Sequence, residues 1–197
     1  MKSLSISRTT RFISDTHFGH AKMLSACARP FDSVEEMDRG MIAAWNSVVR
    51  RDDHVWHLGD FGYKVKPDYL KRVFDQLNGI KHLIVGNHDH DQVATTEFGW
   101  ASVDQIRVLN YEGQKVVLCH YPMREWPDFW HGAIHLFGHT HANIPSTHRS
   151  LDVGVDNVGF TPVSMEEIQQ RLSLLPEIDF RGAPPIVLEE EEALPEP

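Results

Sequence analysis

The chain has 197 residues, of which 41% are hydrophobic, and it contains two cysteines. This composition suits one domain with a sizeable core, whereas two thiols cannot supply a disulfide framework, and no stretch approaches the ~20 apolar residues of a membrane span. Of the formal charge of −9, residues 177–197 carry −6 and the remaining body −3, and the absence of a basic stripe disfavours a dedicated nucleic-acid binder.

We expect one cytoplasmic domain over residues 1–175, because the sequence shows neither a signal-like apolar segment nor a membrane span. Cys27 and Cys119 fit a reduced protein, and Cys119 lies in a strand-like run as a small core residue. Residues 176–197 form an acidic tail rich in proline and glutamate, which we expect to be partly disordered.

Five short apolar runs end in side chains that can bind a metal ion. Such runs are typical of buried strands, and α/β folds build their sites at the carboxyl ends of strands. In chain order the runs are 11–14, 55–58, 82–85, 115–119 and 133–137. The polar residues that follow them are, in the same order, Asp15 and His17, then Asp60, then Asn87, His88 and Asp89, then His120, and finally His139 and His141. The recurrence predicts a metal site assembled from strand ends.

Three helices have recognisable end signals. The capping-box pattern Ser33-x-x-Glu predicts the start of an amphipathic helix, and Ser164-x-x-Glu predicts a last helix that ends near residue 174. Between them, Pro67 indicates a helix in its first turn, and Gly79 is expected to be its C-cap.

The remaining segments predict two more strand regions and a loop. Residues 103–109 alternate between apolar and polar side chains, and the following Glu112-Gly113 turn predicts a hairpin over 103–119. Residues 151–156 indicate a further strand. The stretch 121–130 is aromatic and contains prolines, which suits a loop lining a site.

Taken together, these motifs resemble the calcineurin-like metallophosphoesterases, and in particular their small bacterial and phage members. The motifs are Asp15-x-His17, Gly59-Asp60, Gly86-Asn87-His88-Asp89, His120 and Gly138-His139-x-His141. The resemblance covers about residues 12–157 and implies an α/β fold, namely a four-layer αββα sandwich of two mixed β-sheets flanked by helices. The alternation of strands and amphipathic helices independently favours the α/β class.

The resemblance also implies two metal ions. Its ligand set places Asp15, His17 and His141 on the first ion and Asn87, His120 and His139 on the second, with Asp60 between them. Seven oxygen and imidazole ligands without a thiolate suit Mn²⁺, which we favour, and also Fe, Zn²⁺, Ni²⁺ or Co²⁺.

Such a centre would hydrolyse a small phosphate ester by attack of a metal-bridging hydroxide. His88 would stabilise the developing charge or protonate the leaving oxygen, with Asp89 orienting its ring.

A histidine after Asn87 favours a phosphodiesterase over a phosphomonoesterase, since in the wider family that position helps to expel the poorer leaving group of a diester. A nuclease on DNA or RNA is the alternative enzyme. A non-catalytic metal-binding scaffold is the alternative of another class, and the retention of all seven ligands argues against it.

Other residues have two interpretations each. His20 is a candidate substrate contact or a buttress of the first loop, and Arg124 is a candidate phosphate contact or a surface ion pair. The aromatic side chains of 121–130 stack on a base or pack the loop. Structural roles are expected for Asp152, Asp156, His54, His57, His82, His131, His135 and His148.

The chain has little room for a specificity-giving cap domain. Substrate choice is therefore expected to come from the loops near His20, Arg29, Tyr63–Lys66 and 121–131. We expect no membrane partner, and the oligomeric state and the physiological substrate are left open.

Overall fold

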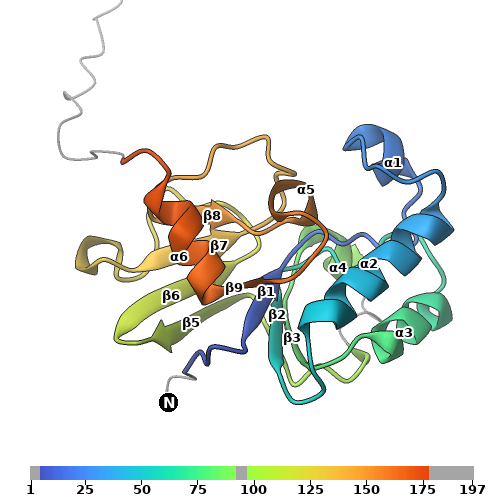
Figure 1. The fold of residues 1–197 in the computed structure, drawn as a ribbon, viewed down its shortest axis with the longest axis horizontal. Helices are drawn as coiled ribbons and strands as arrows, with labels where there is room; N and C mark the ends of the chain where they lie inside the picture. Colours follow the sequence, from blue (N-terminus) through green and yellow to red (C-terminus); the bar gives the residue numbers. More distant parts are fainter. Residues whose placement is uncertain (1–4, 92–96, 178–197) are drawn as a thin grey trace, which may run out of the picture.

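Two mixed β-sheets face each other in the computed structural model, which describes residues 5–91 and 97–177 (Figure 1). Almost all of the predicted tail therefore lies outside the described residues. The five-stranded sheet has the order β4-β3-β2-β1-β9, and its one antiparallel pair is β1 with β9. Its strands are β1 (Arg11–Ile13), β2 (His54–His57), β3 (Ile80–Ile84), β4 (Ser102–Asp104) and β9 (Val163–Ser164).

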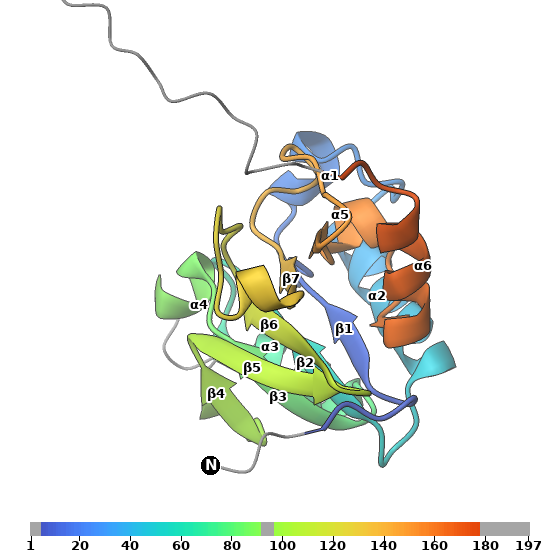
Figure 2. The ribbon, with the colours of Figure 1, turned by 90° about the vertical axis from the view of Figure 1, so that its left-hand side faces the viewer.

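The four-stranded sheet has the order β5-β6-β7-β8, with β5 and β6 antiparallel and the other pairs parallel. Its strands are β5 (Ile106–Tyr111), β6 (Gln114–Cys119), β7 (Ile134–Phe137) and β8 (Ser150–Asp152). In Figure 2, β5 and β6 lie in front of β2 and β3.

Apolar side chains fill the spaces between the layers. Phe12 and Trp56 of the first sheet belong to one cluster with Leu118 of the second, so this core lies between the sheets. On the outer face of the five-stranded sheet, a second core joins Val55 to Trp45 and other residues of two helices. These helices, α2 (Val34–Val48) and α3 (Pro67–Gln76), lie side by side in Figure 1.

The predicted αββα sandwich is confirmed. Its two outer layers differ, because α2 and α3 cover the five-stranded sheet, whereas an irregular segment covers the four-stranded sheet. Over the four-stranded sheet, Val117 packs against Trp126 and Phe129 of the segment 121–133, which contains the short 3-10 helix η2 (Phe129–His131). The last helix, α6 (Met165–Ser173), contributes apolar residues to the core between the sheets. The remaining helices are α1 (Lys22–Ala26), α4 (Asn87–Asp91) and α5 (Val155–Val158). None of the described helices is long and apolar enough to cross a membrane.

The predicted helix starts are confirmed. Ser33 caps α2 by accepting a hydrogen bond from the Glu36 amide, although the Glu36 carboxylate accepts from the Asp32 amide and so does not complete the reciprocal pair. Ser164 and Glu167 form the full capping box at the start of α6.

Three predicted boundaries are wrong for identifiable reasons. The C-cap of α3 is Leu77, and Gly79 instead takes a φ of +96° in the tight turn before β3. The alternating stretch 103–109 divides into β4 and β5, which are edge strands of different sheets. The alternation of apolar and polar side chains continues across both strands and therefore hides the break between them. The strand predicted over 151–156 ends at Asp152, whose carboxylate accepts from the Gly154 amide and turns the chain into α5.

Candidate metal centre

The motif residues lie together at the carboxyl ends of β1, β2, β3, β6 and β7. Backbone hydrogen bonds join the loops that follow these strands. The Asp15 amide donates to the Gly59 carbonyl (3.0 Å), and the His17 amide donates to the Asp60 carbonyl (3.0 Å). The Gly138 amide donates to the His120 carbonyl (2.9 Å), so the loops of both sheets are held in fixed register around one point.

Five of the seven proposed ligands have a left-handed backbone, which non-glycine residues rarely adopt. They are Asp15, His17, Asp60, His139 and His141, with φ between 48° and 69°. Such a conformation is of order 1–3 kcal/mol unfavourable at each residue and persists only where the surroundings determine it. The concentration of this strain at one point indicates that the side-chain directions are selected for function.

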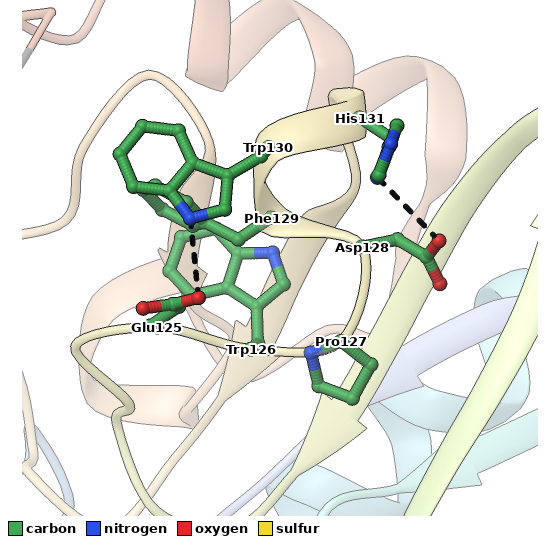
Figure 3. Close-up of a pocket in the computed structure, with 7 residues that line it drawn as sticks. All are labelled: Glu125, Trp126, Pro127, Asp128, Phe129, Trp130 and His131. Carbon is green, nitrogen blue, oxygen red and sulfur yellow. Dashed lines mark hydrogen bonds and ion pairs between the residues drawn. The ribbon is translucent and has the colours of Figure 1, made fainter.

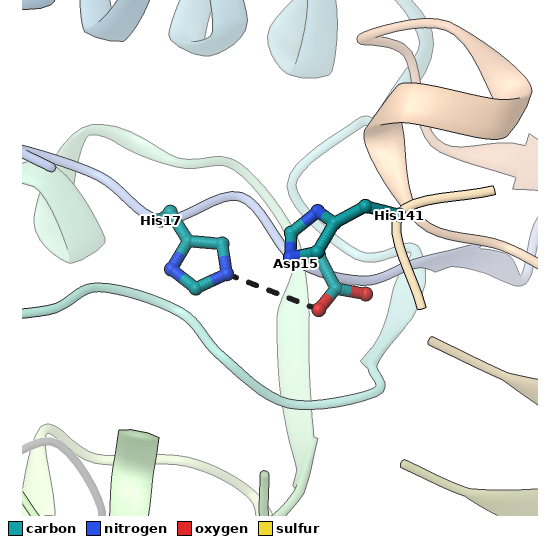
Figure 4. Close-up of side chains that lie close together, drawn as sticks. All are labelled: Asp15, His17 and His141. Atoms are coloured by element: carbon teal, nitrogen blue, oxygen red, sulfur yellow. Dashed lines mark ion pairs between the residues drawn. The ribbon is translucent and has the colours of Figure 1, made fainter. Parts of the chain in front are cut away.

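The first proposed metal group contains Asp15, His17 and His141, whose candidate ligand atoms lie within 4.8 Å of one another. His17 Nε2 is 4.0 Å from Asp15 Oδ1, and the rings of His17 and His141 have centroids 5.2 Å apart. Figure 4 shows the three side chains converging from the two loops that carry them.

The second proposed group contains Asn87, His120 and His139. Asn87 Oδ1 lies 3.1 Å from His120 Nε2 and 2.8 Å from His139 Nδ1. The same two histidines also form a cluster with the Asp60 carboxylate. The arrangement gathers one amide oxygen and two imidazole nitrogens at the ends of β3, β6 and β7.

Asp60 lies between the two groups. Its Oδ2 is 3.6 Å from His17 Nε2 of the first group and 3.6 Å from His120 Nε2 of the second. Its Oδ1 accepts a hydrogen bond from the His88 amide (2.9 Å). A single carboxylate oxygen is therefore near both groups, as a bridging ligand requires.

The donor atoms fit divalent cations. The buried Nε2 of His17 has no hydrogen-bond partner among the described residues, although it points toward two carboxylates. His120 donates from Nδ1 to the Leu58 carbonyl (2.7 Å), and His141 donates from Nδ1 to Asp156 (2.7 Å). Each of these bonds fixes the tautomer that leaves the lone pair of Nε2 available to a metal.

Burial sets the charge state of the same residues. Desolvation raises the pKa of Asp15 to about 7 and, with the nearby Asp15 charge, that of Asp60 to about 8. Desolvation also lowers the pKa of His17 and lowers that of His120 to about 4. His17 and His120 are thus neutral, as metal ligands must be, and the buried carboxylates lack a compensating charge that a divalent cation would supply.

We expect the stabilisation of the protein by Mn²⁺ to increase between about pH 6 and about pH 8. Asp15 and Asp60 have pKa values above the ordinary 3.8 in the folded state, so the metal-free fold loses stability as pH rises from about 4 through 7 and 8. The cation binds the ionised carboxylates and competes with their protons. Thermal unfolding with and without Mn²⁺ at both pH values measures the effect, and an equal gain in melting temperature at the two would contradict it.

His88 lies beside the bridging position. Its Nε2 is 3.9 Å from Asp60 Oδ2, and its side chain is 26% exposed. Its ring packs against Tyr63 at a centroid distance of 3.8 Å, and Tyr63 in turn contacts the ring of His20 at 5.1 Å. The loop of Tyr63 is expected to influence substrate choice, but no local sequence pattern reveals that Tyr63 packs on His88.

Asp89 is fully buried and accepts three backbone hydrogen bonds. The donors are the amides of Asp60 (2.8 Å), Gly86 (2.9 Å) and Phe61 (3.1 Å). These contacts fix the left-handed turn that presents Asp60. The orientation of the His88 ring by Asp89 stays a prediction.

The two candidate substrate residues differ in position. His20 is near the centre, with Nδ1 3.5 Å from Nδ1 of His17. Arg124 is exposed, and no ion pair or hydrogen bond joins it to the described residues of the metal groups. His20 therefore remains the better placed of the two.

The aromatic loop supplies a hollow of its own, shown in Figure 3 and lined by residues 125–131. Trp126 and Phe129 are buried, which favours the packing interpretation for them. Trp130 is half exposed and donates to the Glu125 carboxylate (3.2 Å). Tyr121 lies nearer the centre, with its ring 4.8 Å from that of His139.

The histidines expected to be structural lie outside every group that could hold a metal within the described residues. His57 contacts the Thr16 hydroxyl, His54 bonds to His82, and His135 stacks under Trp126. Asp152 and Asp156 also support the loops, since Asp152 accepts from Thr140 and Ala142 and Asp156 from His141.

Cys27 is the one thiol near the centre among the described residues, in a group with His141 and Asp156. Burial, followed by the adjacent Asp156 carboxylate, raises its pKa to about 11. Both oxygens of Asp156 are already hydrogen-bonded to Arg29. A protonated thiol beside an occupied carboxylate is a poor ligand, so the predicted donor set without sulfur is retained.

Comparison with known proteins gives a family match and related sequences. A family model for the calcineurin-like phosphoesterase superfamily domain matches residues 10–161, a range that contains all seven proposed ligands. An uncharacterized protein of Methanocaldococcus jannaschii is 37% identical over 169 residues, which cover 82% of this chain and 89% of that protein. The gene 66 protein of Mycobacterium phage L5 is 34% identical over 191 residues, which cover 81% and 91%.

A solved structure has the same fold. It is a protein of unknown function from Aquifex aeolicus, with 22% sequence identity and a TM-score of 0.65. The match covers 82% of this chain and 98% of that one, so the sandwich is shared almost in full by the smaller chain.

Proposed function

This chain belongs to the calcineurin-like phosphoesterase superfamily, whose members act on phosphate esters, and on that premise we propose that it is a dinuclear metal-dependent phosphodiesterase. We further propose Mn²⁺ as the preferred ion, because the ligand set consists of carboxylate, amide and imidazole groups. The substrate would be a small or exposed phosphate diester.

The observation that carries this proposal is the position of Asp60. One of its oxygens lies 3.6 Å from a nitrogen of His17 and 3.6 Å from a nitrogen of His120, which belong to different donor groups. Asp15 and His141 complete the first group, and Asn87 and His139 complete the second. Two groups that share one buried carboxylate favour a pair of cations over a single structural ion.

Two divalent ions, when bound, would activate the attacking water and neutralise charge on the phosphoryl oxygens. The chain supplies the remaining functions. His88 borders the shared carboxylate, is partly exposed and can therefore reach a substrate phosphate. A protonated His88 would donate to the leaving oxygen of a diester, and this donation matters most for an alkoxide, which is a poorer leaving group than a phenolate. Tyr63 packs on the His88 ring and restricts its rotation.

The test is hydrolysis of bis-p-nitrophenyl phosphate, p-nitrophenyl phosphate and a diester with an alkoxide leaving group, by the wild type and by His88→Ala. We expect the wild type to prefer diesters. The variant should lose about 100-fold or more in kcat on the alkoxide ester, because general acids contribute most where the leaving group is poor, and less on the p-nitrophenyl diester. Metal content is measured in parallel and should remain two ions per chain.

His131→Ala is the matched control, since this histidine is 83% exposed in its side chain and lies outside the metal groups. It should retain wild-type rates on all three esters. Preferential turnover of the monoester, with little effect of His88→Ala, would instead indicate a phosphomonoesterase. A wild-type protein that binds fewer than two ions would contradict the dinuclear proposal.

A further inference from the structure

Arg29 is a fully buried cation that takes no part in the ligand set. Its guanidinium donates from Nε and Nη2 to the two oxygens of Asp156, at 2.8 Å and 2.9 Å. The same group donates from Nη1 to the Thr16 carbonyl and from Nη2 to the Asp15 carbonyl, each at 2.8 Å. A buried charge is tolerated where it is paired and its donors are satisfied, and Arg29 meets both conditions.

The oxygen acceptors of Arg29 all belong to the first metal group or adjoin it, and Nη1 also donates to Met37 Sδ of α2 (3.6 Å). Asp15 is a proposed ligand with a left-handed backbone, and Thr16 is the residue between Asp15 and the second proposed ligand, His17. Asp156 accepts the Nδ1–H of His141, the third member of the group. One side chain thus contacts the backbone that presents two ligands and the carboxylate that orients the third.

We propose that Arg29 is the positioning residue that assembles the first metal group. It holds the Asp15–His17 turn through two carbonyl oxygens and holds His141 through Asp156, whose carboxylate selects the tautomer with a free Nε2. The second group has no contact with Arg29 in the part of the chain that the structure describes. This role rests on the proposed function, which identifies the ligands. Arg29 is the additional residue on which one of the two ion sites depends.

Lysine cannot replace arginine in this role. The planar guanidinium matches a carboxylate with two parallel hydrogen bonds and still has donors for two carbonyls in other directions. A lysine ammonium has three donors on a compact head and cannot span these acceptors, although it keeps the charge. Arg29→Lys therefore separates geometry from charge.

The experiment is a calorimetric titration of the metal-free protein with Mn²⁺, together with electron paramagnetic resonance of the coupled ion pair. We expect the wild type to bind two ions. Arg29→Lys should keep one site at wild-type affinity and weaken the other by about 10- to 100-fold, the usual effect of removing a residue that orients a ligand. The spectrum of the coupled pair should be lost at ion concentrations that saturate the wild type.

Asp156→Asn is the second variant, because it nearly preserves side-chain volume and remains informative if Arg29→Lys does not fold. It should weaken the same single site, since a neutral amide orients His141 less strongly. Arg149→Lys is the matched control. Arg149 also donates to a backbone carbonyl, that of Phe129, but it lies directly before β8 and outside the metal groups, so both sites should stay intact.

The inference is overturned if a folded Arg29→Lys or Asp156→Asn protein binds both ions with wild-type affinity, or if the two sites weaken equally. Failure of the proposed function has a different signature. In that case the wild type itself would not bind two ions, whatever the behaviour of the variants.

Discussion

Replacement of Asp60 with asparagine is expected to remove the coupled metal pair and to lower kcat on phosphate diesters by at least about a thousandfold. The loss corresponds to about 4 kcal/mol of transition-state stabilisation, within the several kcal/mol that a correctly placed metal ion supplies. An amide oxygen is neutral and cannot balance two cations, whereas the Asp60 oxygen lies 3.6 Å from a nitrogen of each donor group. Steady-state kinetics and metal titration measure the two losses.

The same substitution should leave the metal-free fold intact or make it more stable. Desolvation raises the pKa of Asp60 to about 8, so ionising this carboxyl in the metal-free protein opposes folding near neutral pH. Asparagine removes that ionisation and can still accept the hydrogen bond of the His88 amide through its oxygen. A gain of 1 kcal/mol would raise the melting temperature by about 2–4 °C in a chain of this size.

The loss of activity is therefore expected without a loss of stability of the metal-free protein, a combination that a simple loss of folding would not produce. Asp75→Asn is a suitable control, because Asp75 is an exposed carboxylate paired with Lys71 on the surface of α3. It should change neither metal stoichiometry nor kcat. A folded Asp60→Asn protein with two tightly bound ions and wild-type turnover would contradict the bridging role.

The centre was largely predictable from the sequence because its residues follow their strands directly. Each proposed ligand lies within a few residues of a short apolar run, and parallel strands bring their carboxyl ends to one edge. Asp15 and His141 are far apart in the chain, yet each is fixed by its own strand, so a local pattern is enough to locate both.

The supporting residues were not predictable in this way. Arg29 and Asp156 are separated by 127 positions, and neither lies in a pattern that marks a buried ion pair. Only the tertiary fold places the α5 turn against the loop after β1. The same holds for Tyr63, whose contact with His88 depends on the loop after β2 lying against α4, which follows β3. The proposed ligands could therefore be grouped from the sequence and Asp156 given a structural role, but the pairing of Asp156 with Arg29 could not be predicted.

The boundary errors have a related origin. Residues 103–109 show a single alternation, but the chain passes from one sheet to the other between β4 and β5. Alternation reports that one face is buried and does not report which sheet buries it. The sequence of residues 151–156 predicts one strand because Leu151, Val153 and Val155 alternate with other side chains. All three are buried, but the hydrogen bond from the Gly154 amide to Asp152 ends the strand.

Close packing around the centre leads to the second large expected effect, which is that of Gly138→Ala. A Cβ atom on Gly138 would overlap Ser14 Oγ and Asp15 Oδ2 and would lie 2.7 Å from Ser14 Cβ. Neither neighbour can move freely, because the Ser14 hydroxyl donates to the Leu58 carbonyl (2.9 Å) and the Asp15 carboxylate accepts from the His139 amide (2.9 Å). The methyl group must therefore displace a proposed ligand or separate β7 from β1.

We expect Gly138→Ala to be destabilised by about 1–3 kcal/mol, as overpacked cores are, and to lose binding at the metal group that contains Asp15. Thermal unfolding and Mn²⁺ titration measure both effects. Gly132→Ala is the control, since Gly132 has a φ of +81° and open space at its Cβ position. That variant carries only conformational strain of about 1 kcal/mol and should bind two ions. The prediction would be contradicted if the two variants lost comparable stability and Gly138→Ala still bound both ions, because the loops would then have moved without displacing Asp15.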